Sequence, residues 1–191
     1  KEVEVGKLTY ERYFSAANRW NALYVPFEIP VELLTQAGYE VAYVNDVHSY
    51  DNLDVNGTPG EDGVIDDMKM EVILIKNGKL NANYPYLIRA NSAGLLSLEI
   101  ENAKLYTTEE KSVSCSSVFM KFEVTGIYES KTAGELGDAN SIYALGGGVW
   151  TLPESPNQQL KPFRLYLKAT KIDGSPVVVD ESTLANIRIR V

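Results

Sequence analysis

Alternation of apolar and polar residues with a period of two dominates this chain. In residues 163–168, Phe163, Leu165 and Leu167 alternate with polar or amphipathic side chains. A period of two turns one face of a strand toward the core and the other toward water. Three further segments show the same alternation: residues 95–101, 120–125 and 187–191. All four are predicted to be half-buried antiparallel strands.

Two other segments, residues 22–29 and 70–75, are nearly continuous runs of apolar residues. Runs of this kind are typical of central strands that are covered on both faces. Pro26 lies inside the first run, and a proline has no N–H to donate to a neighbouring strand. The sequence therefore predicts a bulge or a break at Pro26.

Turn-forming residues separate the apolar segments. Asn77-Gly78 stands between residues 73–76 and 79–80, and Asn-Gly tolerates the positive φ of a tight turn, so a β-hairpin is predicted there. One short helix is predicted over residues 30–37, with Pro30 in its first turn and Gly38 after its end.

The number of segments determines the predicted fold class. About ten strands and one short helix are more than a single sheet holds without folding over. The sequence therefore predicts an all-β fold, an antiparallel two-sheet β-sandwich. The chain has 191 residues, of which 45% are hydrophobic and 23% charged. These values suit one domain that spans residues 1–191.

The net charge and the first residue of the chain limit the partners and the cellular setting that we expect. The formal net charge is -8, which disfavours nucleic acid because its binding depends on Lys and Arg at phosphates. No run of about 20 apolar residues could cross a bilayer, so this domain is not expected to insert into a membrane. Because the chain starts at Lys1 and not at Met, we interpret it as a mature or trimmed form, from which a signal peptide, if one existed, is already removed.

Five sequence motifs occur in series along about 150 residues. They are Arg19-Trp-Asn-Ala-Leu-Tyr-Val-Pro-Phe27, Tyr84-Pro-Tyr-Leu-Ile-Arg-Ala90, Phe122-Glu-Val-Thr-Gly-Ile-Tyr128, Ile142-Tyr-Ala-Leu-Gly146 and Leu160-Lys-Pro-Phe-Arg-Leu-Tyr-Leu167. In this order they resemble a β-sandwich module of exported Bacteroidetes surface proteins of the adhesin type, which often follows leucine-rich or Ig-like repeats. The resemblance implies a cell-surface or extracellular setting and supplies no catalytic residues.

The acidic segment 51–67 is the candidate metal site. Ca²⁺ prefers six to eight oxygen ligands, which alternating Asp and Asn residues around a glycine can supply. The spacing of an EF-hand fails, because Gly63 stands where the loop needs a bidentate Glu. A Ca²⁺ site of another kind would use Asp54, Asn56, Asp62 and Asp66. The alternative is a solvated, turn-rich loop, since Asp, Asn and Gly are common turn residues.

The residues that could carry nucleophilic or metal chemistry are few. His48 is the single histidine, and alternation places His48 and Asp46 on one face of a strand and Ser49 on the other. A Ser-His-Asp arrangement is therefore not expected. Cys115 is the single cysteine, which excludes an intrachain disulfide. We interpret its side chain as a small buried group.

Aromatic residues are the last candidates, with twelve tyrosines and two tryptophans in the chain. Aromatic side chains can stack on sugar rings or anchor a protein partner. Trp150 follows a glycine-rich segment and is the candidate ligand-binding residue, with packing against the end of a sheet as the alternative. Trp20 is expected to lie in the core.

The sequence favours a non-catalytic cell-surface module for adhesion or for binding an extracellular glycan or a host or surface protein. Two alternatives remain. One is a structural spacer domain with no ligand. The other is a carbohydrate-active hydrolase, since 26 acidic residues offer many carboxylate pairs whose separation the sequence does not give.

Overall fold

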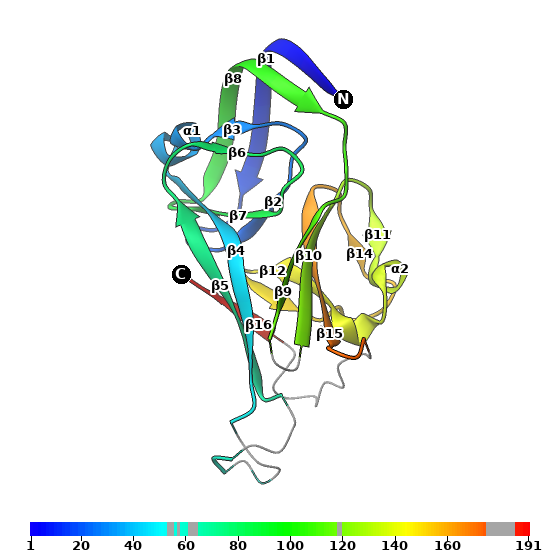
Figure 1. Cartoon of the computed structure of the whole chain (residues 1–191). Coiled ribbons are helices and arrows are strands. Elements are labelled where there is room, and N and C mark those ends of the chain that lie inside the picture. The colour runs from blue at the N-terminus through cyan, green and yellow to red at the C-terminus, as the bar shows by residue number, and fades with distance from the viewer. Residues whose placement is uncertain (53–55, 57, 61–64, 118–119, 175–185) are drawn as a thin grey trace.

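The computed structural model describes residues 1–52, 56, 58–60, 65–117, 120–174 and 186–191. The predicted all-β class is confirmed, since strands dominate and the helices are short. In the described part of the chain no helix has the length and apolar character that a membrane span requires. Figure 1 shows the arrangement of the elements.

One ten-stranded sheet forms most of the structure. In spatial order it contains β2 (Asn21–Leu23), β7 (Tyr86–Ala90), β4 (Tyr39–Tyr50), β5 (Asp67–Ile75), β16 (Asn186–Arg190), β13 (Val149–Thr151), β12 (Ile142–Gly146), β15 (Arg164–Lys171), β10 (Met120–Ile127) and β9 (Ser112–Ser116). Neighbouring strands are antiparallel, except that β16 and β5 are parallel.

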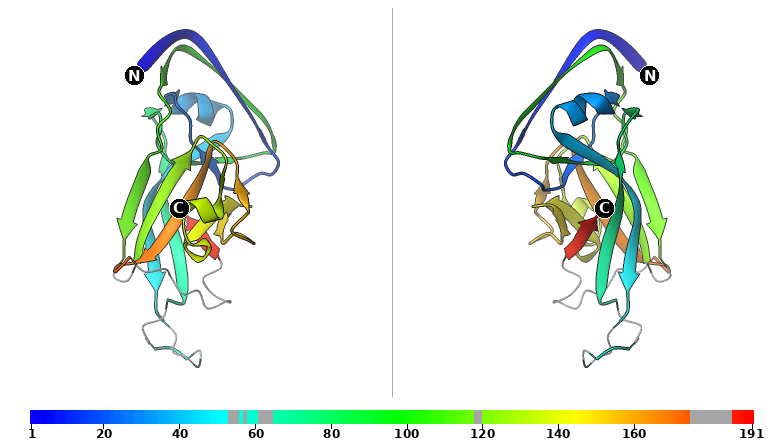
Figure 2. Two further views of the ribbon diagram at one scale, coloured as in Figure 1. Left: turned by 90° about the vertical axis from the view of Figure 1, so that its right-hand side faces the viewer. Right: turned by 90° about the vertical axis from the view of Figure 1, so that its left-hand side faces the viewer.

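In the described ranges, three small two-stranded sheets and three short helical segments complete the fold. The pairs are β1 (Glu2–Phe14) with β8 (Gly94–Tyr106), β3 (Ile29–Pro30) with β6 (Lys79–Leu80), and β11 (Lys131–Thr132) with β14 (Gln159–Leu160). The helices are α1 (Val31–Gln36), α2 (Ala133–Leu136) and a 3₁₀ turn at Ala139–Ser141. The β1–β8 pair arches over α1 at one end of the molecule (Figure 2).

The ten-stranded sheet curls until its last strand, β9, contacts β4. A register shift between Val44 and Asp46 marks a bulge in β4, and a bulge bends a strand and increases its twist. The hydroxyl group of Ser49 in β4 and that of Ser117, just after β9, lie 2.6 Å apart where these two strands approach each other. The curled sheet encloses a first core that includes Phe122. Strands predicted to form two packed sheets therefore lie in one sheet that closes around its own core.

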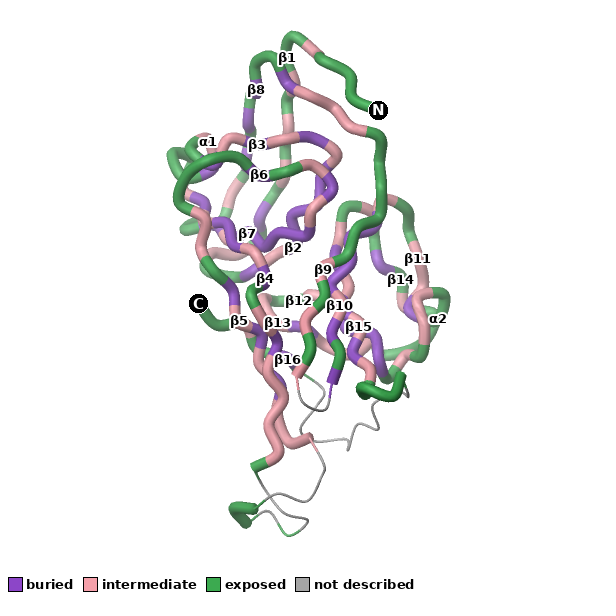
Figure 3. The backbone as a smooth tube through the Cα atoms, in the orientation of Figure 1, coloured by how far each residue is buried: buried purple, intermediate pink, exposed green. Residues whose placement is uncertain are grey.

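A second core lies on the opposite face of β2, β7 and β4. It is covered by the β1–β8 pair, α1 and the β3–β6 pair, and it includes Phe14, Ile29, Leu34 and Leu98. The buried positions of Figure 3 follow these two cores, while the N-terminal end of β1 is exposed. The segment around β2 serves both cores, because Ala22 belongs to the first and Leu23 to the second.

The structure confirms the predicted helix and the predicted break at Pro26. The helix is confirmed as α1, with Pro30 at its N-terminus and Gly38 in a left-handed conformation after its end. The break at Pro26 is also confirmed, since β2 ends before it and β3 begins after it. The prediction that both faces of residues 70–75 are covered is wrong at Ile73, which is 40% exposed.

The hairpin predicted at Asn77-Gly78 is wrong. Gly78 does adopt the predicted positive φ of 82°. However, β6 pairs with β3 and not with β5. One edge of β5 is paired with β4 up to Ile75, next to the turn, and the other edge is paired with β16 at residues 69–71. The turn at Gly78 was therefore predicted correctly, while pairing with a distant segment decided which strand β6 joins.

Tyr24 joins the two cores. Its ring lies directly against Gly126 of β10, so closely that a Cβ at this glycine would overlap the ring carbons. Its hydroxyl group donates to the carbonyl oxygen of Glu109 and accepts from the N–H of Lys111 at 2.8 Å. Residues 107–111 connect β8 of the second core to β9 of the first. Tyr24 therefore fixes the crossing point of the chain between the cores.

Asn83 reinforces this crossing point. It is 4% exposed, and its side chain donates to the carbonyl oxygen of Thr107 at 3.0 Å and accepts from the hydroxyl group of Tyr128. Its backbone N–H donates to the carbonyl oxygen of Val25 at 2.9 Å. A buried amide of this kind is stable only when its donors and acceptors are satisfied. Four separate segments are thus tied together at one buried amide.

We expect Gly126→Ala to destabilise the fold by about 1–3 kcal/mol, because the added methyl group displaces the Tyr24 ring from a packed site. Urea unfolding followed by tyrosine and tryptophan fluorescence measures the loss. Gly6→Ala is the matched control, since a Cβ at Gly6 meets nothing within 4 Å. Equal stability of the two variants would contradict the role of the Tyr24–Gly126 contact.

Candidate functional site

A groove of about 900 Å³ opens between β1, residues 25–27 and the turn that precedes β15. Its lining is mainly aromatic and cationic. The aromatic and charged lining residues are Tyr10, Glu11, Arg12, Tyr13, Phe14, Phe27, Lys161, Phe163 and Arg164. A concave site of this size with an apolar wall and a few polar groups is typical of a small-ligand site. We call it the aromatic groove.

Phe163 stands at the edge of the aromatic groove in an unusual conformation. Its φ is +59°, and its side chain is 48% exposed. The prediction that Phe163 faces inward with Leu165 and Leu167 is wrong, because the left-handed backbone turns it outward just before β15 begins. Its N–H donates to the carbonyl oxygen of Ile127 at 2.8 Å, which holds this geometry.

Left-handed backbone at a bulky residue costs about 1–3 kcal/mol, and such residues gather at functional sites. The ring of Phe163 makes an edge contact with the ring of Tyr128, whose centroid is 5.5 Å away. Tyr128 in turn lies 4.8 Å from Tyr24 at the crossing point. The exposed ring is therefore positioned by the buried core beneath it.

The opposite wall of the groove comes from β1 and the segment after β2. Tyr10 and Phe27 form an edge-to-face pair with centroids 5.6 Å apart. Tyr13 also lines the groove, but alternation along β1 turns its exposed ring to the same side as Glu11, so Tyr10 and Phe27 form this wall. Aromatic side chains of this kind offer a large, rigid surface at low entropic cost, which suits a ligand-contacting wall.

Two arginines supply the charge of the aromatic groove. Arg12 donates to the carbonyl oxygen of Ala22, and its guanidinium carbon lies 4.9 Å from the centroid of the Phe14 ring. Arg164 is half-buried, and burial lowers its pKa, as does the nearby charge of Arg12. Two positive charges are thus held close together at one site.

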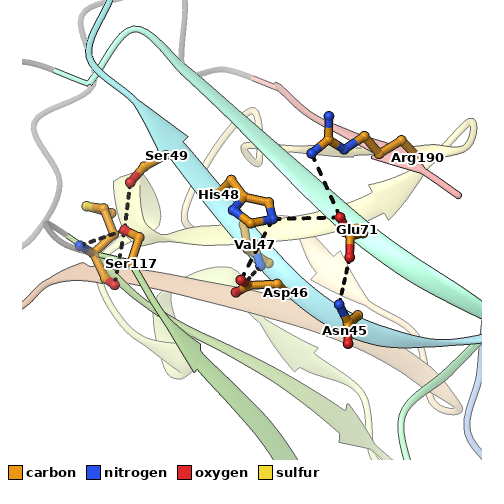
Figure 4. A network of polar contacts seen from close by, with 9 residues as sticks. Asn45, Asp46, Val47, His48, Ser49, Glu71, Ser117 and Arg190 are labelled. Atoms are coloured by element: carbon orange, nitrogen blue, oxygen red, sulfur yellow. Dashed lines mark hydrogen bonds and ion pairs between the residues drawn. The ribbon is translucent and has the colours of Figure 1, made fainter.

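The His48 region forms a different polar cluster on the outer surface of β4 and β5 (Figure 4). His48 Nε2 lies 3.7 Å from Asp46 Oδ2 and 3.9 Å from Glu71 Oε2. Ser49 contacts Ser117 and not His48, as alternation along the strand predicts. The side chains of His48 and Asp46 are both 37% exposed. The three residues of a Ser-His-Asp arrangement are therefore not brought together.

The acidic segment is only partly described. Asp54 and Asp62 lie outside the described residues, so the Ca²⁺ prediction is not tested there. Asp66 accepts from the N–H of Asn52 at 2.6 Å, and the N–H of Gly60 donates to the carbonyl oxygen of Asn52. Asn56, also described, is exposed. Within the described ranges, no group of three or more His, Cys, Asp or Glu side chains is placed to hold a metal ion.

Trp150 is not on the surface. It has 0% exposure, and its indole N–H donates to the sulfur atom of Met70 at 3.2 Å. A ligand cannot reach a side chain enclosed by the curled sheet, so the prediction that Trp150 binds a ligand is wrong. Trp20, 6% exposed, is in the core as predicted, and Arg89 lies over its ring.

Sequence reasoning missed the aromatic groove because its walls come from three distant segments. One signal was present. In residues 8–14 the inward series Leu8, Tyr10, Arg12 and Phe14 has a period of two, and an arginine interrupts an otherwise apolar face. A charged residue at such a position needs a structural or functional partner.

Cys115 lies on β9 at the point where the curled sheet approaches β4. It is half-buried and packs against the first core. Burial raises the pKa of the thiol to about 11; the carboxylate of Asp46 adds to this increase, and the N–H of Val47 opposes it. A thiol in this environment is poorly nucleophilic near neutral pH.

We expect Cys115 to react with iodoacetamide at pH 8 about 100-fold more slowly in the folded protein than in denaturant, because the thiolate fraction falls by that factor when the pKa rises from 9.0 to about 11. Between pH 8 and 9 the rate in the folded protein should increase about tenfold. Mass spectrometry of the alkylated protein measures both rates. Equal rates in the two states would show that the thiol is not shielded.

Comparison with known proteins gives no assignment for the groove. No family model, no curated protein and no solved structure matches this chain.

Proposed function

We propose that this domain is a non-catalytic binding module and that the aromatic groove binds a glycan. The observation that carries the proposal is Phe163, an exposed aromatic ring held in a strained backbone conformation at the edge of a concave site. A strained, exposed aromatic residue reduces stability and solubility. Its presence is explained when the ring contacts a ligand.

The shape of the site favours a glycan over a protein partner. A stable protein interface buries about 800 Å² on each side. The exposed large hydrophobic residues are instead spread over several elements, among them Val3 at one end of β1 and Ile73 on β5. The aromatic groove itself offers aromatic faces on two sides and donors from arginine. Sugar rings present apolar C–H faces and many hydroxyl acceptors, which match this combination.

The lining also supports binding without hydrolysis. Glycosidases commonly use two carboxyl groups on either side of the scissile bond. Among the described residues, Glu11 is the one carboxylate in the lining of the groove. Its Oε1 accepts from the hydroxyl group of Ser97 at 3.2 Å, which directs it to the β1–β8 surface. The resemblance to modules of exported Bacteroidetes surface proteins supports a cell-surface or extracellular setting for this binding activity.

We expect Phe163→Gly to weaken glycan binding at least about tenfold while leaving the melting temperature unchanged or higher. The loss of binding is about 1.4 kcal/mol or more, the size expected for an anchoring aromatic residue. Stability should be kept because glycine adopts the positive φ without strain. A panel of immobilised oligosaccharides, followed by calorimetry on the best ligand, gives affinity, and differential scanning calorimetry gives stability.

Ile172→Ala is the control for removing an exposed apolar side chain, since Ile172 is 58% exposed and does not line the groove. The proposal predicts unchanged glycan binding in this variant. Unchanged binding in Phe163→Gly, or an equal loss in both variants, would contradict a role of the aromatic groove.

A further inference from the structure

Arg12 and Arg164 have no ion-pair partner among the described carboxylates. The ion pairs of the described residues engage other cations, such as Lys7 with Glu99 and Arg89 with Glu40. Arg12 has a backbone carbonyl oxygen and an aromatic face as its partners. Arg164 makes one long hydrogen bond, of 3.4 Å, to the carbonyl oxygen of Phe163. The charge of both guanidinium groups is therefore uncompensated within the groove.

The carboxylate in the groove lining does not correct this imbalance. Glu11 precedes Arg12 in β1, and successive side chains of a strand point to opposite faces. The burial pattern agrees, because Glu11 is exposed while Arg12 is half-buried. Lys161, which also lines the groove, adds a further positive charge. The groove is thus cationic on a protein whose formal net charge is -8.

Two like charges held together in a partly desolvated site oppose each other unless an anion lies between them. The geometry of arginine favours a planar anion, because its parallel N–H groups match the two oxygens of a carboxylate. Arg12 is also preorganised by the Phe14 ring and the Ala22 carbonyl oxygen, so less entropy is lost when an anion binds. The site has the features of an anion receptor.

The rest of the surface limits the kind of anion. A net charge of -8 repels a long polyanion at long range, whereas the few carboxylates of a short oligosaccharide are screened over about 10 Å. The aromatic rings of Tyr10 and Phe163 stand beside the arginines and require an apolar face on the same ligand. A sugar ring that carries a carboxylate combines both features in one small unit.

We infer that the aromatic groove binds an acidic glycan, with a uronate carboxylate held by Arg12 and Arg164 and the sugar ring stacked on Phe163. The inference rests on the proposed glycan-binding function and adds the charge of the ligand to it. It assigns the arginines to recognition of the carboxylate and the aromatic residues to the sugar ring. These two contributions can be separated experimentally.

The test uses matched pairs of oligosaccharides on the full chain, measured by titration calorimetry. The probes are tetra-galacturonate and a hyaluronan tetrasaccharide, each compared with its methyl ester. The acidic form should bind at least about tenfold more tightly than its ester for one of the pairs, because the ester has lost the charge that arginine recognises. In Arg164→Gln this preference should fall to about twofold or less, because the acid loses more affinity than its ester.

Arg188→Gln is the matched control, because Arg188 is exposed on β16 outside the groove. It should keep the full preference for the acid. Arg12→Gln should also lose the preference for the acid. Its melting temperature shows whether the loss of the contacts that Arg12 makes with Phe14 and Ala22 has destabilised the fold. A tetra-glutamate peptide is the third arm, and it should bind at least about tenfold more weakly than the acidic glycan.

The outcomes distinguish the two proposals. Equal binding of acid and ester, lost in Phe163→Gly, would overturn the acidic ligand and leave the glycan-binding function standing. Tetra-glutamate binding as tight as that of the acidic glycans would overturn the assignment to a sugar. Absence of binding to both uronate probes would overturn the uronate inference. In that case the oligosaccharide panel with Phe163→Gly decides the glycan-binding function separately.

Discussion

The contact between the ring of Tyr24 and the backbone of Gly126 is the constraint on which the arrangement of this protein depends. The described residues build two main cores, one inside the curled sheet and one beneath the β1–β8 pair, besides a small cluster around Ile127. Tyr24 belongs to the first core and directly follows Leu23 of the second, and its ring lies on Gly126 with no room for a side chain there. The Tyr24 hydroxyl group donates to the carbonyl oxygen of Glu109 and accepts from the N–H of Lys111, and the buried amide of Asn83 adds further hydrogen bonds at this place.

The aromatic groove follows from that contact. Val25 and Phe27, which line one wall, come directly after Tyr24 in the chain. Phe163 on the other wall is held by Ile127, the residue after Gly126, and by the ring of Tyr128. These two wall segments thus follow directly in the chain from the buried contact between Tyr24 and Gly126. A site built in this way is rigid without a metal ion or a disulfide, because its exposed rings rest on a packed core.

Sequence patterns predicted the local elements better than their partners. Alternation identified the strands around Leu98, Phe122 and Leu165, and helix α1 was predicted to within one residue at each end. Pairing was harder, because β6 joins β3 after a turn that reads as a hairpin, and ten strands close into one sheet. The two-residue strands, such as β11, are too short for any periodicity to show. Trp150 illustrates the same limit, since its burial is decided by β16 and β5 of the curled sheet.

The candidate site lies where local rules and the global fold disagree. Alternation places Phe163 inward, yet its backbone turns it outward at an energetic cost. Arg12 occupies an apolar face, and burial next to Arg12 disfavours the charged form of Arg164. Packing alone would replace each of these residues with one that fits its environment better. Because all three conflicts meet in one groove, a common ligand explains them more economically than three unrelated structural accommodations.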